Sequence, residues 1–553
     1  MAVNNQDIEF CTAANGDTTA KIQREDGREL YLHSSFNPVE EADFLIGKIP
    51  IQENTLYVVI GFGLGYHVQA LLKRIPSSSR VVAVESSNWR LAIAARDMKR
   101  RQGSKWMNDS RLVVKDFKKP ETVCFTLADV FVKNKLHSLE MFTHIPSVAT
   151  DEKFYREIIE TIPQEFAMRI SAQIHSLDTT LEHNLTNYIA NLPVTWHNPS
   201  IDKLRNKWAG QPLIIVSAGP SLTEQLDVLK RVQGKAIIVC VGTAVKALIK
   251  HGIRPDFVIA IDPYYENMVH FEGWDTTQAA LLYYHNVWRG IPANYKGAKF
   301  WFTMQDETPI PLQSDCRDST FIAGGTVAFS ALQFARYVKA SPVILVGQDM
   351  SFYQGRTHAE GIEYNLSYSE ENLPEGFFHV PGTNGTSVVT NQAYYSYLVL
   401  MQEYILRNQD VKYINTSLTG AKIEGTEVKP LAEVIAGFCN RPAEIDKAIR
   451  EIYSHYQPVS NKDIIKLLNK WEVEIIRFLE KSNAVTEVDK LVSRFKNLEL
   501  YKVNHIYYSQ FFYAACLKEK WSDSSAKTTV AERLRAHAEF ALEVIRRNRD
   551  ELQ

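Results

Sequence analysis

The chain of 553 residues carries few of the features that mark membrane, secreted or nucleic-acid-binding proteins. No stretch approaches the roughly 18 consecutive apolar residues that a membrane-spanning helix needs. The first ten residues, MAVNNQDIEF, have no basic segment before an apolar core, so they do not resemble a signal peptide. The formal net charge of −2 provides no bulk attraction for nucleic acid. We therefore expect a cytoplasmic protein that engages neither a membrane nor nucleic acid.

Cysteine pairs at metal-binding or redox spacing are also missing. The six cysteines are scattered without C-x-x-C spacing, at Cys11, Cys124, Cys240, Cys316, Cys439 and Cys516. This pattern argues against a disulfide framework and a zinc ribbon, and it fits unpaired thiols in a reducing compartment. The sequence shows no internal repeat and no low-complexity tract. Its length exceeds what one hydrophobic core can organise, so we expect about two to four domains.

Three regions differ in their hydrophobic pattern. Residues 1–195 are predicted to form a Rossmann-like α/β domain, because strand, glycine turn, helix and strand follow one another from residue 55 onward. Residues 200–429 are predicted to form a central α/β domain, and residues 430–553 an all-helical domain with apolar residues at helical spacing. The stretch 194–211, VTWHNPSIDKLRNKWAGQ, is interpreted as a linker.

The central region contains short runs rich in Ile and Val. Continuous apolar runs, as opposed to strict alternation, favour parallel strands covered on both faces. The runs span residues 213–216, 236–242, 257–262, 280–285, 299–303 and 342–347. A doubly wound α/β fold is therefore expected here.

A glycine-rich turn, Gly61-x-Gly63-x-Gly65, follows the first strand of the N-terminal region and precedes a helix. Glu85 ends the next strand, where an acid can accept hydrogen bonds from ribose hydroxyls. The spacing is more typical of the nucleotide turn of S-adenosylmethionine methyltransferases than of a dinucleotide fingerprint. The turn predicts a possible second nucleotide-type site, or else a tight turn without a ligand.

A second turn of small residues, SAGPS, occupies Ser217–Ser221 after a buried strand of the central region. Gly219 is expected to take a positive φ, and Pro220 presets φ for the following helix. Ser221 is predicted to be the helix N-cap, which would leave the next amides free to hold an anion at the carboxyl end of the strand. From this turn alone, ordinary helix capping is the favoured explanation.

Similar turns follow other strands of the same region. Since the carboxyl ends of parallel strands meet at one edge of a sheet, these residues are expected to converge on one nucleotide cleft together with Ser217 and Gly219. They are Gly242 and Thr243, Asp262, the Gly324-Gly325-Thr326 triplet, and Asp349.

The loop after the last of these strands contains a histidine. His358 lies among Gly355, Arg356 and Gly361 in a polar stretch. An imidazole with a pKa near neutrality is suited to removing a proton from a hydroxyl, so His358 is the candidate base. The alternative is a surface histidine without a catalytic role.

Five motifs of the central region resemble those of a known family. VSAGPSL, DFVIAIDP, GGTVAFSALQFA, VILVGQDMSF and GRTHAEG, in this order and spacing, resemble the central domain of the motility-associated factor (Maf) flagellin glycosyltransferases. That domain is similar to archaeal 6-hydroxymethylpterin pyrophosphokinase and to the sialyltransferases of glycosyltransferase family 42, which implies a sialyltransferase-like (GT-A-like) central fold. The resemblance covers about 200–430 strongly, whereas the flanking regions match the family's three-part layout more loosely.

The resemblance implies roles for individual residues. Gly219, Pro220 and Ser221 would hold the CMP of a sugar donor, and Thr326 would stand in place of a serine that contacts the nucleotide. Thr243 and Asp262 fall near positions where family 42 uses asparagines. Asp262 departs from that pattern because it replaces a neutral amide, and the family's tyrosine pair has no counterpart that a motif identifies.

The implied activity is transfer of a nonulosonic acid, of the pseudaminic or legionaminic type, from its CMP donor to Ser or Thr of flagellin, as flagellum assembly and motility require. His358 would deprotonate the acceptor hydroxyl, while Asp349 or Asp262 would hold sugar or ribose hydroxyls. No D-x-D motif appears at the expected place, so neither a metal nor another cofactor is expected. CMP-nonulosonic acid and flagellin are the expected partners.

Two other readings remain open. The first is transfer of a diphosphoryl group from ATP to a hydroxymethylpterin, with Asp262 and Asp349 holding magnesium. The second is a non-catalytic flagellin-binding factor that uses the helical tail and the aromatic run HIYYSQFFY at 505–513.

Overall fold

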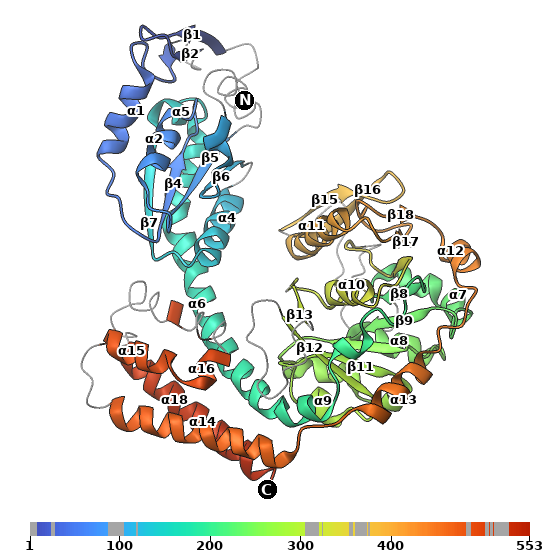
Figure 1. The fold of residues 1–553 in the computed structure, drawn as a ribbon. Helices are drawn as coiled ribbons and strands as arrows, with labels where there is room; N and C mark the ends of the chain where they lie inside the picture. Colours follow the sequence, from blue (N-terminus) through green and yellow to red (C-terminus); the bar gives the residue numbers. More distant parts are fainter. Residues whose placement is uncertain are drawn as a thin grey trace. The chain divides into compact units, whose positions relative to one another are not determined.

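The structure is a computed structural model. It describes residues 8–23, 28–86, 104–117, 120–304, 320–322, 324–352, 358–359, 373, 376–482, 488–503, 508, 512–513 and 530–553. The chain divides into two compact units (Figure 1): unit 1 consists of Met1–Thr179 and Ser509–Arg533, and unit 2 of Thr180–Tyr508 and Leu534–Gln553. The three-domain division predicted from the sequence stays a prediction.

Unit 1 contains, within its described residues, a four-stranded parallel sheet in the order β6-β5-β4-β7 and a three-stranded antiparallel sheet. The parallel strands are β4 (Thr55–Ile60), β5 (Arg80–Glu85), β6 (Leu112–Asp116) and β7 (Ser138–Thr143). The antiparallel strands are β1 (Ile8–Thr12), β2 (Thr18–Gln23) and β3 (Glu29–Tyr31). The helices are α1 (Pro38–Gly47), α2 (Tyr66–Arg74), η1 (Ser104–Asn108), α4 (Pro120–Lys133), α5 (Ile145–Val148) and α6 (Glu152–His197), which begins in unit 1 and ends in unit 2.

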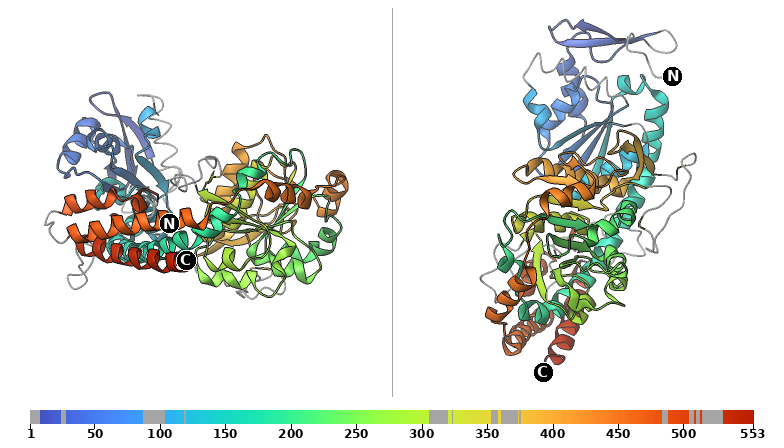
Figure 2. Two further views of the ribbon diagram at one scale, coloured as in Figure 1. Left: turned by 60° about the horizontal axis from the view of Figure 1, so that its bottom comes forward. Right: turned by 90° about the vertical axis from the view of Figure 1, so that its right-hand side faces the viewer.

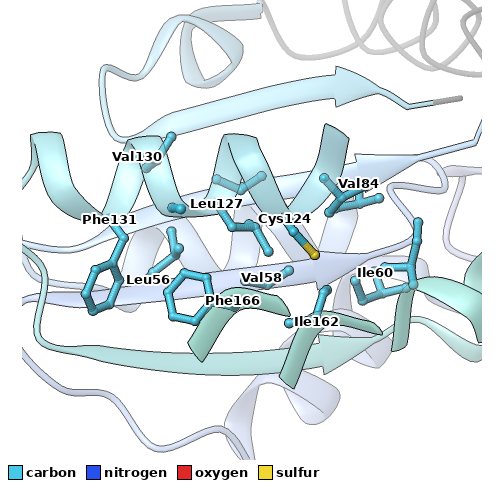
Figure 3. Close-up of a cluster of buried hydrophobic side chains, with 14 of the residues drawn as sticks. Leu56, Val58, Ile60, Val84, Cys124, Leu127, Val130, Phe131, Ile162 and Phe166 are labelled. Atoms are coloured by element: carbon cyan, nitrogen blue, oxygen red, sulfur yellow. The ribbon is translucent and has the colours of Figure 1, made fainter. Parts of the chain in front are cut away.

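Strand β4 is apolar along most of its length because both of its faces are covered. Leu56, Val58 and Ile60 pack against residues of α4 and α6 in one hydrophobic cluster (Figure 3). The alternate residues Tyr57 and Val59 belong to a second cluster, which includes side chains of α1 and α2. Side chains of a strand alternate between the faces of a sheet, so a continuous apolar run is what a doubly covered strand requires.

Unit 2 is organised, as far as it is described, around a nine-stranded sheet in the order β13-β12-β11-β10-β9-β8-β14-β17-β18, with every neighbouring pair parallel. The strands are β8 (Leu213–Val216), β9 (Ile237–Val241), β10 (Phe257–Ala260), β11 (Ala280–Tyr284), β12 (Lys299–Met304), β13 (Thr320–Phe321), β14 (Val343–Val346), β17 (Tyr413–Asn415) and β18 (Glu427–Val428). An antiparallel hairpin is formed by β15 (Phe377–Pro381) and β16 (Ser387–Asn391).

Helices cover both faces of the nine-stranded sheet (Figure 2). The short ones between strands are η2 (Ile201–Leu204), η3 (Pro220–Gln225), α7 (Leu226–Lys230), α8 (Gly242–Lys250), η4 (Tyr265–Phe271), η5 (Thr276–Gln278), α9 (Gly290–Asn294) and α10 (Val327–Tyr337). The helices that come later in the chain are α11 (Gln392–Arg407), α12 (Leu431–Phe438), α13 (Ile445–His455), α14 (Asn461–Ser482), α15 (Val488–Lys496), α16 (Glu499–Val503) and α18 (Val530–Asp550). Of these, α14, α15 and α16 pack against one another. None of the described helices has the length and apolar character that crossing a membrane demands.

Each parallel sheet has a point where the strand order reverses. In unit 2 the chain adds β9 to β13 on one side of β8 and then β14, β17 and β18 on the other side. In unit 1 the order reverses in the same way between β4 and β7. Ligands of open α/β sheets bind outside the carboxyl ends of the strands at such a switch point. The β8–β14 and β4–β7 switch points are therefore the places to look for sites.

The α/β class and the helical C-terminal region predicted from the sequence are confirmed. The six predicted central strands appear as β8 to β12 and β14, and the elements described from Leu431 onward are all helices. The interpretation of 194–211 as a linker is wrong. Helix α6 continues to His197, and the rest of the segment packs its apolar side chains into unit 2. The buried members are Trp196, Ile201, Leu204 and Trp208.

Gly347 illustrates how closely β8 and β14 approach at their carboxyl ends. Its φ is +65°, in the region that favours glycine, and a Cβ there would collide with the carbonyl oxygen of Ser217. Gly234 has a similar φ of +76°, but a Cβ there would meet no atom within 4 Å. Comparing substitutions at the two glycines therefore separates the cost of the left-handed backbone conformation from the cost of a steric collision.

We predict that Gly347→Ala destabilises the protein far more than Gly234→Ala does. Both substitutions carry the left-handed penalty of about 1–2 kcal/mol, and only Gly347→Ala adds a collision, for a total above about 3 kcal/mol. Calorimetric melting of the full chain measures the difference. Equal melting temperatures for the two variants would contradict the close approach of the two strands.

Candidate functional site

A cavity of about 280 Å³ lies at the carboxyl ends of β8, β9, β10 and β14 in unit 2. Most of the residues that the sequence predicted for the site line it: Ser217, Gly219, Gly242, Thr243, Asp262, Gly325, Thr326, Asp349 and His358. Pro220, Ser221 and Gly324 are described but are not among its lining residues. Three members of the predicted histidine loop, Gly355, Arg356 and Gly361, lie outside the described residues. The structure thus brings predicted residues from six separate stretches of the chain to one cavity.

Ser221 and Asp349 connect β8 to β14 beneath this cavity. The peptide N–H and the hydroxyl of Ser221 donate to the two carboxylate oxygens of Asp349, at 2.8 and 2.6 Å. The hydroxyl of Ser417 donates to the same carboxylate. Burial raises the pKa of Asp349, and the hydrogen bonds from Ser221 and Ser417 partly offset that effect. The acceptor held by the SAGPS turn is therefore the carboxyl group of the protein's own Asp349.

Three sequence-based expectations for this turn are wrong. The N-cap of η3 is Gly219, not Ser221, and Gly219 has a φ of −64°, not a positive value. Glycine is required because the backbones approach closely: a Cβ on Gly219 would collide with the carbonyl oxygen of Gly347. The N–H of Leu222, which was expected to be free, donates to the Gly219 carbonyl at 3.0 Å. The turn is consequently a junction between two strands.

The first residues of two longer helices line the cavity instead. Gly242 and Thr243 open α8, and Thr326 is the N-cap of α10 without a side-chain capping hydrogen bond. First-turn N–H groups have no carbonyl partner within their own helix, and they favour anionic groups. Gly325, just before the cap, has a φ of +66°. Gly324 packs its backbone against the ring of Phe329 and so has a structural role.

Besides Asp349, two histidines and Asp262 supply titratable groups to the cavity. His358 is half-buried, and the N–H of the next residue, Ala359, donates to the Ala218 carbonyl at 2.8 Å. Burial lowers the pKa of His270, and the nearby charges of Lys246 and His358 lower it further. Burial also raises the pKa of Asp262. A neutral imidazole at His270 can accept a proton, which makes it a second candidate base.

Sequence reasoning missed several lining residues. Asn267 and His270 come from the 3₁₀ helix η4, and Tyr394 and Tyr397 come from α11. None of them belongs to a small-residue turn after a strand, which was the signal used to find the others. In the sequence, Tyr394 and Tyr397 stand out only as part of an amphipathic helix, which lies beyond the motifs that marked the site.

In unit 1 the predicted glycine turn is packed against the unit's own side chains. A Cβ on Gly61 would collide with the side chain of Ser147, and one on Gly63 would lie 2.9 Å from Nε2 of His33. Gly65 is the N-cap of α2 in the left-handed conformation. These contacts explain the glycines without a ligand.

Glu85 is buried and already has partners. Its carboxylate accepts hydrogen bonds from the Tyr155 hydroxyl at 2.5 Å, from the Ser86 N–H at 2.9 Å and from the Phe62 N–H at 3.3 Å. A ribose hydroxyl would have to share this carboxylate with these donors. The second nucleotide-type site stays a prediction.

Comparison with known proteins gives three likenesses. The family model described as 6-hydroxymethylpterin diphosphokinase MptE-like matches residues 186–355, less than a third of the chain. An uncharacterized protein of Treponema pallidum (strain Nichols) is 24% identical over 362 residues, which are 60% of this chain and 58% of the relative. This chain therefore spans less than two thirds of that relative's length.

The third likeness is to a solved structure, that of a Maf glycosyltransferase from Magnetospirillum magneticum AMB-1. The TM-score is 0.49 with 16% identity, over 100% of this chain and 92% of that chain. The family model confirms the predicted likeness of the central region to the pterin diphosphokinase-like proteins. The solved structure carries the name of the other family that the motifs resemble.

We predict that Ser417→Ala lowers stability by about 1–3 kcal/mol, because a buried carboxylate loses a donor and the Gly420 N–H loses its acceptor at 3.0 Å. The penalty should be larger above the pKa of Asp349 than below it, since the lost hydroxyl stabilises the charged form. Thermal melting across a pH series measures both effects. The control is Ser396→Ala on the exposed face of α11, which should stay within about 0.5 kcal/mol of the wild type. Equal losses of stability in Ser417→Ala and Ser396→Ala would contradict the hydrogen-bonded junction around Asp349.

Proposed function

We propose that the protein is a cytoplasmic glycosyltransferase that transfers a nonulosonic acid from a CMP donor to Ser or Thr of flagellin. The observation that carries this proposal is that all five motifs resembling the Maf central domain contribute to one cavity. Their contributions are Ser217 to Gly219, Ile259 to Asp262, Gly325 to Ala328, Gly347 to Ser351, and His358. Ser217 in the first motif and His358 in the last are 141 positions apart in the sequence. A shared site explains why they occur together.

The nucleotide phosphate is proposed to lie against the first turns of α8 and α10. Thr243 and Thr326 come from these turns, and both line the cavity. Helix N-terminal N–H groups stabilise an anion without the cost of reorganising solvent. The phosphate leaves the sugar with added negative charge, so donors fixed at this place would favour the transition state over the bound donor.

The chemistry is a substitution at the anomeric carbon of the nonulosonic acid. The acceptor hydroxyl oxygen forms a bond to that carbon while the bond to the phosphate oxygen of CMP breaks, and CMP departs with the bonding pair. The hydroxyl proton passes to His358, the base predicted from the sequence. His270, whose pKa is lowered by burial, lies in the same cavity and can assist.

The two aspartates have different proposed roles. Asp262 lines the cavity and accepts no side-chain hydrogen bond among those found for the described residues, so it is the one proposed to hold a sugar or ribose hydroxyl. Asp349 also lines the cavity, but both of its oxygens are engaged by Ser221. We therefore propose Asp349 as a positioning residue that fixes the SAGPS turn. No metal or other cofactor enters this mechanism.

The family match favours a second candidate. The pterin diphosphokinase-like model covers β8 to β14, and thus most of the cavity lining, so diphosphoryl transfer from ATP to a hydroxymethylpterin is the alternative. That reaction would use Asp262 and Asp349 to hold magnesium. Calorimetric titration with CMP, and separately with ATP and magnesium, distinguishes the two. Binding of neither nucleotide would favour a non-catalytic flagellin-binding factor.

We predict that Thr326→Asp weakens CMP binding by at least about 10-fold, since a carboxylate at the α10 N-cap repels the phosphate. Asp and Asn are both good N-caps, so the helix is preserved in either variant. Thr326→Asn, which has the same shape without the charge, is the matched control and should bind CMP within a few-fold of the wild type. Calorimetry of both variants checks this result. Unchanged CMP affinity in Thr326→Asp would place the nucleotide elsewhere.

We predict that His358→Gln slows glycosylation by about 10²–10⁴-fold while CMP affinity is kept, because the base acts only in the chemical step. Intact-mass measurement of flagellin, co-expressed in a host that makes the CMP-activated sugar, follows the product over time. His251→Gln, at the C-terminal end of α8 and away from the cavity lining, is the control. If His270→Gln abolished transfer and His358→Gln did not, the two histidines would exchange roles.

A further inference from the structure

Three buried histidines meet at the β4–β7 switch point of unit 1. His33 follows β3, His67 lies in the first turn of α2, and His144 is the N-cap of α5 directly after β7. A ring nitrogen of each lies within 4.8 Å of a ring nitrogen in each of the others, and no other such group was found among the described residues. The rings of His67 and His144 are 4.3 Å apart between centroids, and those of His33 and His144 are 4.7 Å apart. The histidine cluster occupies the place where an open α/β sheet usually holds a ligand.

In two of the imidazoles, one ring nitrogen contacts a neighbouring polar group and the other has no hydrogen-bond partner. Nε2 of His67 donates to the carbonyl oxygen of Gly61 at 2.9 Å, and Nδ1 of His144 lies 2.7 Å from the hydroxyl of Ser147. Their remaining nitrogens, Nδ1 of His67 and Nε2 of His144, are buried and have no hydrogen-bond partner. A buried polar atom without a partner costs free energy, and an ion or a water molecule is the usual explanation.

The third imidazole is oriented by a carboxylate. Nδ1 of His33 lies 3.4 Å from Oε2 of Glu41, and Nε2 accepts the N–H of Leu64 at 3.1 Å. His33 is therefore protonated on Nδ1 when neutral, and an ion bound at Nε2 would take the lone pair that now accepts the Leu64 N–H. Nε2 is also the atom nearest to Gly63, where a Cβ would lie 2.9 Å away. Glycine at that position leaves room for the ring.

This pattern matches the outer shell of metal-binding histidines. Such histidines donate their second nitrogen to a carboxylate, a carbonyl or a neighbouring polar group, which fixes the tautomer and aims the lone pair at the ion. Here the neighbouring groups are the carboxylate of Glu41, the carbonyl of Gly61 and the hydroxyl of Ser147, one for each ring. Burial lowers the pKa of His67 to about 3 and lowers that of His33 and His144 as well. The neutral imidazole is the form that binds metal ions.

We propose that His33, His67 and His144 bind a divalent transition-metal ion of the zinc class. Three imidazole nitrogens without a thiolate suit Zn²⁺ and its first-row neighbours better than Mg²⁺ or Ca²⁺, which prefer oxygen. Bonds of about 2.0–2.1 Å in a tetrahedron place the ligand nitrogens about 3.3 Å apart, so rotation of the rings draws them together from their present spacing. A water molecule would complete the four ligands.

The proposed ion would join three parts of unit 1 that are distant in sequence: the segment between β3 and α1, the start of α2, and the β7–α5 junction. The role of this ion would be structural, and it is independent of the sugar transfer proposed for unit 2. The histidine cluster also occupies the space next to Gly63, in the glycine turn that the sequence predicted to bind a nucleotide.

The test is titration of the full-length protein, stripped of metal, with Zn²⁺ in competition with a chromophoric chelator. The expected result is one equivalent bound with a dissociation constant below about 1 μM, and Co²⁺ in its place should show the absorption bands of a four-coordinate ion. His67→Gln and His144→Gln should each weaken binding by more than about 100-fold, because loss of an outer partner alone costs about 10–100-fold. His455→Gln, an exposed histidine of α13, is the matched control and should bind as the wild type does.

Two further variants keep the test decisive if a glutamine variant fails to fold. Glu41→Gln and Ser147→Ala leave all three ligands in place and should weaken Zn²⁺ binding by about 10–100-fold. Circular dichroism establishes that each protein is folded. The proposal is overturned if folded wild-type protein binds no stoichiometric Zn²⁺, or if the affinity is the same in the wild type and in every folded cluster variant.

Discussion

The junction between β8 and β14 is the constraint on which the unit 2 site depends. Gly219 and Gly347 let two backbones approach so closely that neither position can carry a side chain. The carboxylate of Asp349 then spans the gap and takes the N–H and hydroxyl of Ser221. Because the strand order reverses here, the helices that follow β9 and precede β14 diverge to either side, as right-handed crossovers in opposite directions require. A cavity lies between the first turns of these helices. The carboxyl group of Asp349 lines it and already accepts hydrogen bonds from Ser221 and Ser417.

Much of the fold was predictable because the strands of a doubly covered parallel sheet must be apolar on both faces. Runs such as Leu213–Val216 and Ile237–Val241 are buried throughout, and the sequence marks them clearly. Strand β7 was missed because its six residues are only half-buried and include a glutamate and two hydroxyl side chains. Strand β17 is three residues long and β18 two, too short for any periodicity to emerge. Their positions follow from tertiary pairing with strands that are far away in sequence.

The site was predictable to the extent that it consists of strand ends. Thr243, Asp262 and Asp349 follow the strands β9, β10 and β14, so parallel pairing brings them to one edge of the sheet. Thr326 joins them as the N-cap of α10. His270 is different: it reaches the cavity from a 3₁₀ helix whose path no local pattern specifies. The function of Ser221 was also beyond the sequence. A serine after Gly-Pro at a helix start is typical of a helix cap. Only the structure shows that Asp349 lies within hydrogen-bond distance, so that Ser221 links β8 to β14.

Unit 1 is assembled from two pieces of chain, and this has a consequence for the order of synthesis. Tyr513 is buried in the hydrophobic cluster behind β4, and its hydroxyl donates to the Leu136 carbonyl at 3.0 Å. Residues 1–179 leave the ribosome first, but Tyr513 follows 334 positions after Thr179. At about 5–20 residues per second, that interval lasts about 17–67 s. During this time the nascent unit lacks one side chain of its core, so its completion is tied to the synthesis of nearly the entire polypeptide.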